Sequence, residues 1–118
     1  MTIKEVSEKY GISVDTLRYY ERVGMIPSVN RTEGGIRDYS QEDLHCVALA
    51  KCMRGAGMPV GSMVEYVRLC RQGDESGKLR LKMLKDQRET LLEQRRQIDE
   101  TLARLDGKIR RIEELANK

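Results

Sequence analysis

One stretch of the sequence carries arginine and tyrosine side chains at helical spacing. Arg18 and Tyr19 precede Arg22 by four and three residues, so all three share one face of a helix. A guanidinium group can address a phosphate or the edge of a base with two parallel hydrogen bonds. A tyrosine such as Tyr19 or Tyr20 can donate a hydrogen bond to phosphate while its ring rests on the domain. This stretch therefore predicts contact with nucleic acid.

Segment 28–39 adds a second group of such residues. Gly34 and Gly35 lie between extended-prone residues and predict a hairpin turn. Arg31 and Arg37 flank this turn, and Tyr39 closes the segment. A β-hairpin beside a helix that reads DNA is a wing, which reaches the neighbouring backbone. The order of basic helix and arginine-bearing wing strengthens the expectation of a DNA-binding domain.

Residues suited to catalysis or metal binding are scarce. His45 is the only histidine, and no cysteine or carboxylate cluster lies near it at ligand spacing. No His/Cys/Asp set or carboxylate pair supports an enzyme. We therefore expect no catalytic residues, no metal site and no cofactor.

Two short helices are expected to position the first group of residues. Thr2 and Glu5 form a capping box that opens a helix, and Gly11 ends it. Ser13 can cap a second helix that Gly24 ends. Two helices joined by a tight glycine-containing turn form a helix-turn-helix pattern, whose second helix enters the major groove.

Two further helices are expected after the wing. Ser40 and Asp43 resemble another capping box and open a helix to about residue 54. Apolar spacing predicts a fourth helix between about residues 60 and 71. The inward stripe of the third helix is predicted to be Leu44, Val47, Ala48 and Cys52.

The sequence changes character at 73–77, which we interpret as a linker between a domain at 1–72 and a helix at 78–118. Apolar residues fill nine of the eleven a and d heptad positions between 81 and 116, and Arg88 and Arg95 fill the other two. The first part is too small to cover this stripe, so we expect pairing with a second copy in a coiled coil. The alternative is packing against its own domain. The predicted dimer residues are Leu81, Leu84, Leu91, Ile98, Leu102, Leu105, Ile109 and Ile112, with Ala116 as the ninth apolar position.

Composition narrows the class of protein. No segment approaches the roughly 18 apolar residues of a membrane span, and no secretory signal follows Met1, so a cytoplasmic location without membrane contact is expected. Aromatic residues make up 4%, which limits the core and favours oligomerisation. Residues 1–76 hold 10 Lys and Arg against 11 Asp and Glu, whereas 77–118 hold 12 against 8. The case for DNA therefore rests on where the arginines lie, because the net charge of +3 belongs to the terminal helix.

The segments IKEVSEKYGISVDTLRYYERVGMIP and NRTEGGIRDYS, followed by the heptad helix, resemble the MerR family of bacterial transcription regulators. The resemblance implies a mainly α protein: a winged helix-turn-helix domain followed by a long dimerisation helix that forms an antiparallel coiled coil. It also implies a homodimer that bends and untwists double-stranded promoter DNA so that RNA polymerase can engage both promoter elements. Ile36 departs from the family, which often has an aromatic residue at that point of the wing. The residues expected to contact DNA are Ser13, Thr16, Arg18, Tyr19, Tyr20, Arg22, Arg31, Arg37 and Tyr39.

Cys52 has two interpretations. The stretch KCMRGAGMP resembles a MerR subgroup that responds to aldehydes and other electrophiles through a cysteine, as part of a stress response. Lys51 and Arg54 flank Cys52 and can favour the reactive thiolate. Alternatively, Cys52 is a small buried residue of the inward stripe. The sequence shows neither the C-terminal ligand domain of longer members nor the cysteines of metal-sensing members, so we expect the small type.

A different class of function stays open at this point. A coiled-coil adaptor would use its small N-terminal domain to bind another protein and would bind no DNA. Salt-dependent, sequence-selective binding to duplex DNA separates the two classes.

Overall fold

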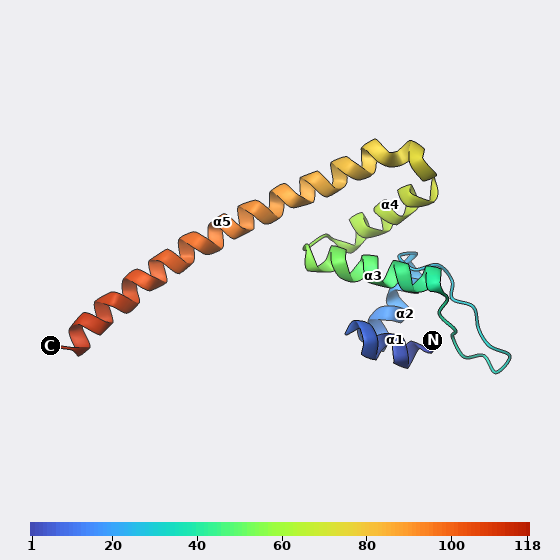
Figure 1. Cartoon of the computed structure of the whole chain (residues 1–118), viewed down its shortest axis with the longest axis horizontal. Helices are drawn as coiled ribbons and strands as arrows, with labels where there is room; N and C mark the ends of the chain where they lie inside the picture. Colours follow the sequence, from blue (N-terminus) through green and yellow to red (C-terminus); the bar gives the residue numbers. More distant parts are fainter.

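A computed structural model describes all 118 residues. Five α-helices follow one another, with a short 3-10 turn before the last (Figure 1). Their bounds are α1 Ile3–Tyr10, α2 Val14–Val23, α3 Gln41–Gly55, α4 Val60–Arg71, the 3-10 helix Gly73–Ser76 and α5 Gly77–Ala116. The first four helices form a small head, and α5 projects from it as a long arm. The expected mainly α architecture of a helical head followed by a long helix is confirmed.

The short helices begin and end at the residues that the sequence indicated. Thr2 Oγ1 accepts a hydrogen bond from Glu5 N at 3.2 Å, and Glu5 Oε1 accepts one from Thr2 N at 2.9 Å, which completes a capping box. Ser13 caps α2 in a similar way. Gly11 and Gly24 end α1 and α2 with φ of 66° and 87°, a left-handed conformation that glycine adopts without steric cost.

The core of the head lies where α1 to α4 meet. It holds fourteen buried residues, and helix α2 contributes Leu17 and Tyr20 to it. Four of the six methionines, at positions 25, 53, 58 and 63, fill space in this core, which fits the absence of Phe and Trp. The largest fully buried side chains are Val6, Leu17, Met25, Ile26, Val47 and Met63.

The predicted inward stripe of α3 is wrong at two of its four positions. Leu44 and Val47 are buried as expected, whereas Ala48 and Cys52 are exposed. The buried face of α3 continues through Ala50 to Met53, at the three-residue spacing of a helix face. The predicted stripe therefore follows the wrong side of the helix after Val47, and Cys52 is not a core residue.

The expected hairpin is a loop with one antiparallel bridge, between Arg31 and Arg37, and no regular strand. Thr32 N donates to Ile36 O at 2.8 Å, and Gly35 turns the chain with φ of 80°. In Figure 1 this loop extends outward from the head, past the N-terminus and the beginning of α3. We refer to residues 30–39 as the wing.

The junction before α5 is a sharp, hydrogen-bonded turn. Ser76 Oγ is buried and donates to Leu69 O at 2.6 Å, and Arg80 Nε donates to Ser76 Oγ at 2.9 Å. The turn sends α5 back alongside α4 (Figure 1). Gln87 Nε2 then donates to Ala56 O at 2.8 Å, which ties the first part of α5 to the end of α3. The far part of α5 extends away from the head (Figure 1). No helix is long and apolar enough to cross a membrane.

Candidate nucleic-acid interface

Helix α2 turns one face to the core and the opposite face to solvent. Leu17 and Tyr20 pack α2 into the core, and Arg18 lies on the outer face with about half of its side chain exposed. The Arg18 guanidinium contacts Asp15 Oδ1 only at 3.5 Å, and both side chains are exposed. Such a pair contributes little in solvent, so the guanidinium is free to exchange this carboxylate for a phosphate or a base edge.

Tyr19 and Arg22, which are also predicted to contact DNA, lie exposed on the same helix as Arg18. The Arg22 guanidinium lies over the Tyr19 ring at 5.2 Å from its centre, and the Tyr19 side chain is exposed. This cation–π contact orients both groups on the outer face of α2. The helix therefore presents two arginines and a phenol side by side, as its sequence spacing predicted.

Ser13 and Thr16 lie at the N-terminus of α2 and are engaged with each other. Ser13 Oγ donates to Thr16 Oγ1 at 2.8 Å and accepts from Thr16 N at 3.1 Å. Ser13 is exposed and Thr16 is half-buried. Both side chains therefore define the start of the helix, and their hydroxyl groups lie at the end of α2 that enters a major groove first in a helix-turn-helix protein.

Tyr20 and Tyr39 do not lie on the interface. Their exposed fractions are 4% and 3%, and both belong to the core of the head. The Tyr39 hydroxyl oxygen is buried without a hydrogen-bond partner, and burial together with the nearby Glu21 carboxylate raises its pKa above the ordinary value of 10.0. Their expected role as DNA contacts is therefore revised: these rings support α2 and the wing from beneath.

The wing arginines differ from each other in the structure. Arg31 is exposed and donates from Nη1 to Gly35 O at 2.8 Å, which closes the loop. Arg37 is largely buried and pairs with Glu21 Oε1 through Nε at 3.1 Å. Because about four fifths of both side chains are covered, Arg37 primarily fixes the wing against α2.

Sequence reasoning missed the residues that hold the wing. Glu21 lies sixteen positions before Arg37, and no local pattern links the two. The amino group of Met1 contacts Asp38 Oδ1 and Tyr39 O, each at 3.2 Å, and Met1 O accepts from Tyr39 N at 2.8 Å. These contacts join the start of the chain to the base of the wing.

Cys52 lies in a different part of the head. It is exposed, near the end of α3, and lines a cavity of about 180 Å³ between α3 and the first part of α5. Met53 and Met58 line the cavity from the head, and Leu84 and Leu91 line it from α5. Cys46 is only partly accessible, and burial raises the pKa of its thiol. The structure thus presents Cys52 to solvent next to the arm.

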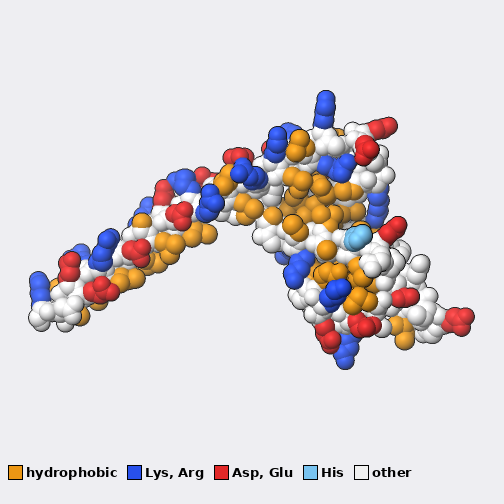
Figure 2. All heavy atoms as spheres, viewed as in Figure 1, with side chains coloured by type: hydrophobic (Ala, Val, Ile, Leu, Met, Phe, Trp, Pro, Cys, Tyr) orange, Lys and Arg blue, Asp and Glu red, His pale blue; other side chains and the backbone are white.

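No group of three or more His, Cys, Asp or Glu side chains could hold a metal ion. The predicted dimer residues of α5 are all solvent-exposed, and hydrophobic atoms run along one edge of the arm in Figure 2. An isolated helix with such a stripe lacks the burial that would stabilise it.

Comparison with known proteins agrees with this geometry. Residues 1–69, which include α2 and the wing, match the family described as MerR HTH family regulatory protein. The HTH-type transcriptional regulator AdhR of Bacillus subtilis is 46% identical over 93 residues, which cover 79% of this chain and 66% of AdhR. The chain thus spans slightly less than two thirds of that relative.

Two solved structures extend the similarity to the arm. A protein of Listeria monocytogenes described as a MerR family transcriptional regulator has 42% identity and a TM-score of 0.82, over 92% of this chain and 83% of its own. HiNmlR, a MerR family regulator lacking the sensor domain and bound to promoter DNA, has 30% identity and a TM-score of 0.79, over 92% and 86%. The helical head, the long α5 arm and these matches together show that the chain belongs to the MerR family of helix-turn-helix regulatory proteins.

Proposed function

We propose that this protein is a sequence-specific transcription regulator that binds double-stranded promoter DNA as a homodimer. The observation that carries the proposal is the outer face of α2, where Arg18, Tyr19 and Arg22 lie exposed on a helix anchored from beneath. Ser13 and Thr16 begin this helix, and Arg31 lies on the adjacent wing. Family membership and the DNA-bound relative HiNmlR support the same assignment.

The mechanism follows from two heads joined through paired α5 helices. Each head inserts α2 into a major groove, and the wing contacts the flanking backbone. As in the family, the dimer bends and untwists the DNA between two promoter elements so that RNA polymerase engages both, which makes deformability of the spacer part of recognition. No reaction is catalysed.

Arg18→Ala tests the interface. Loss of a guanidinium that binds a base edge weakens specific binding by about 1–3 kcal/mol without unfolding the protein. Arg68→Ala is the matched control, because Arg68 is exposed to a similar degree but lies on α4. Affinity measured by fluorescence anisotropy on promoter duplex should fall for Arg18→Ala alone and decline steeply with salt.

Normal binding by the folded Arg18→Ala protein would contradict the assignment of α2 to DNA. If the unmodified protein binds the duplex independently of salt, or does not bind it at all, the result favours the coiled-coil adaptor that the sequence left open. The first result would mean that DNA binds at another surface of the protein, and the second would mean that the protein has a different class of function.

Regulation through Cys52 is a finer part of the proposal. Its sulfur is exposed at the cavity between α3 and α5. A thiolate there can add to the carbonyl carbon of an aldehyde: the S–C bond forms, the carbonyl π electrons move to oxygen, and that oxygen takes a proton from water. The resulting hemithioacetal makes the Cys52 side chain larger where it lies beside α5.

Cys52→Ser should abolish the response of promoter transcription to an added aldehyde, while DNA binding without aldehyde stays unchanged. Cys70→Ser is the control, because Cys70 is less accessible and lies outside this cavity. A full aldehyde response in Cys52→Ser would exclude the thiol of Cys52 as the sensor.

A further inference from the structure

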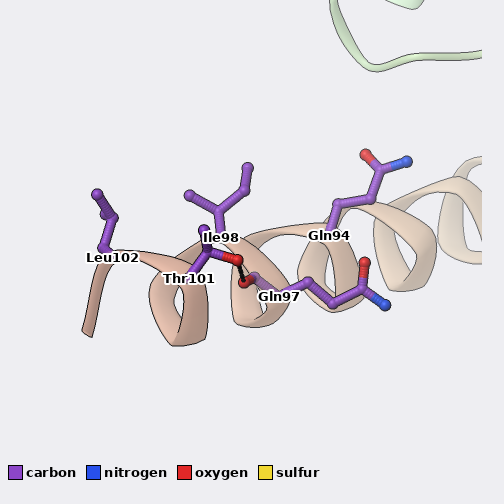
Figure 3. Close-up of a pocket in the computed structure, with 5 residues that line it drawn as sticks. All are labelled: Gln94, Gln97, Ile98, Thr101 and Leu102. Carbon is purple, nitrogen blue, oxygen red and sulfur yellow. Dashed lines mark hydrogen bonds between the residues drawn. The ribbon is translucent and has the colours of Figure 1, made fainter. Parts of the chain in front are cut away.

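The exposed apolar stripe of α5 is interrupted by two arginines. Arg88 and Arg95 occupy a positions, between the leucine and isoleucine positions of the same stripe. The middle of the stripe is a shallow open groove in which Ile98 and Leu102 project from the helix beside Gln94 and Thr101 (Figure 3). A charged residue at an a position is costly in a coiled coil and fixes register where a partner charge meets it.

Several charges on the outer face of α5 are already paired within the chain. Lys82 pairs with Asp86 at 2.6 Å, and Arg96 pairs with both Glu93 and Glu100. The charges beside the stripe are not satisfied in this way, although they lie on the same helix.

Arg95 in the stripe has no ion pair. The charged residues at the flanking e positions have none either, and they are Lys85, Asp99, Asp106 and Glu113. Arg88 reaches only its neighbour Glu89, at 3.9 Å. Three cations and three anions along one edge are therefore available to a second helix.

The charges favour the antiparallel orientation that the family resemblance implies. A parallel pair would place Arg88 against the partner's Arg88 and Arg95 against the partner's Arg95 in the seam. Like charges in direct opposition are destabilising. An antiparallel pair instead brings the e positions of both helices to the same edge, where the a-position arginines meet aspartates.

We infer that α5 pairs with a second copy in one antiparallel register, in which Arg95 lies opposite the partner's Ile98 and Leu81 opposite the partner's Ile112. This register places Arg95 beside the partner's Asp99 and Arg88 beside the partner's Asp106. It rests on the proposed homodimer and adds the residues that determine its alignment.

The neighbouring registers fit the stripe less well. A shift by one heptad in one direction sets Leu84 opposite the partner's Ala116 in place of Ile109, which buries less apolar area. A shift in the other direction shortens the overlap and sets Arg95 beside the partner's Leu92, so one arginine loses its carboxylate. The first shift still sets Arg95 beside the partner's Asp106 and Arg88 beside the partner's Glu113, so the larger buried apolar area decides for the inferred register.

This register also completes the Cys52 cavity. Leu84 and Arg88 line the cavity from the same chain, and the partner's Ile109 and the partner's Asp106 lie opposite them. Cys52 is then covered by the far end of the other subunit's helix. A group attached to its sulfur would press on the subunit contact as well as on its own arm.

Distances between spin labels measure the register directly. A label at position 82 lies 29 residues along the axis from its symmetry mate, or about 43 Å at 1.5 Å per residue, and a label at position 104 lies about 22 Å from its mate. A one-heptad shift toward Ala116 lengthens the first distance to about 54 Å and shortens the second to about 12 Å. A parallel pair reduces both axial separations to zero.

The labels require a background in which Cys46, Cys52 and Cys70 are replaced, with dimer mass and DNA affinity measured first. Axial distances near 43 and 22 Å support the inference. Any other pair of distances in a dimer that binds DNA overturns the register while the proposed function stands. A monomer in the unmodified chain overturns both.

Charge exchange tests the same contacts in the unlabelled protein. Arg88→Asp and Asp106→Arg should each weaken dimerisation about tenfold, because each creates two like-charge contacts per dimer. The double variant should return to within about threefold of the parent. Positions 88 and 106 lie about 27 Å apart on one helix, so only contact between subunits can produce this rescue.

Arg104→Asp is the control, because Arg104 lies on the outer face and carries no ion pair. Its dissociation constant from analytical ultracentrifugation should stay within about twofold of the parent. Absence of rescue in a folded double variant, or an equal loss in Arg104→Asp, would refute the pairing of Arg88 with the partner's Asp106.

Discussion

Replacing Tyr39 with phenylalanine removes one buried oxygen from the base of the wing. Tyr39 is 3% exposed, and its hydroxyl has no hydrogen-bond partner. Burying a polar group without a partner costs about 1–3 kcal/mol. The gap left by one missing oxygen offsets only a fraction of that, at roughly 24 cal/mol per Å³ of cavity. We therefore expect Tyr39→Phe to raise the free energy of unfolding by about 1 kcal/mol.

For a chain of this size, a change of about 1 kcal/mol raises Tm by about 4 °C. Thermal unfolding followed by circular dichroism measures it, at one protein concentration because a dimer's Tm depends on concentration. Tyr19→Phe is the control, because the Tyr19 ring is exposed and its Tm should not change. Affinity for promoter DNA should also stay the same in Tyr39→Phe, since the hydroxyl lies beneath the interface.

The raised pKa of Tyr39 adds a pH test. Burial favours the neutral phenol in the folded protein, so the unfolded chain ionises first as the pH rises past about 10. The parent should then lose stability, and Tyr39→Phe should lose less. A lower Tm in Tyr39→Phe, or a large loss of DNA affinity, would refute the reasoning, because the hydroxyl would then be bonded or in contact with DNA.

Three further outcomes follow from individual contacts. Iodoacetamide should alkylate Cys52 before Cys46 in a mass-spectrometric time course, because Cys52 is exposed whereas burial raises the pKa of the Cys46 thiol; equal rates in the folded protein would contradict this. Gly24→Ala should lower stability to urea by about 1 kcal/mol, because the residue ends α2 at φ 87°; an unchanged midpoint would show that the backbone relaxes. Gln87→Ala removes the hydrogen bond to Ala56 O and should speed hydrogen exchange in the first part of α5, with exchange in α1 as the internal control.

Local signals account for what was predictable about the helices. The capping boxes at Thr2 and Ser40 and the cap at Ser13 are interactions over three residues, so they are visible in the sequence. Gly24 ends α2 for an equally local reason, its left-handed φ. The exposed face of Arg18, Tyr19 and Arg22 follows from helical periodicity once Leu17 faces inward.

Contacts between distant segments decided the rest. Arg37 was expected at DNA, but its pairing with Glu21 depends on how the wing folds against α2. Apolar spacing predicts Cys52 on the inward stripe of α3, and only the packing of α3 shows that this face points to solvent.

The sequence alone determined the family, the helix order and the heptad stripe of the arm, because each rests on neighbouring residues or on regular spacing. The tertiary structure decided which side chains are available for function. It buried Tyr20 and Tyr39, exposed Cys52 beside α5, and left most charges along the stripe without partners. The physical reason is that burial and ion pairing depend on how segments pack together, which local spacing does not specify.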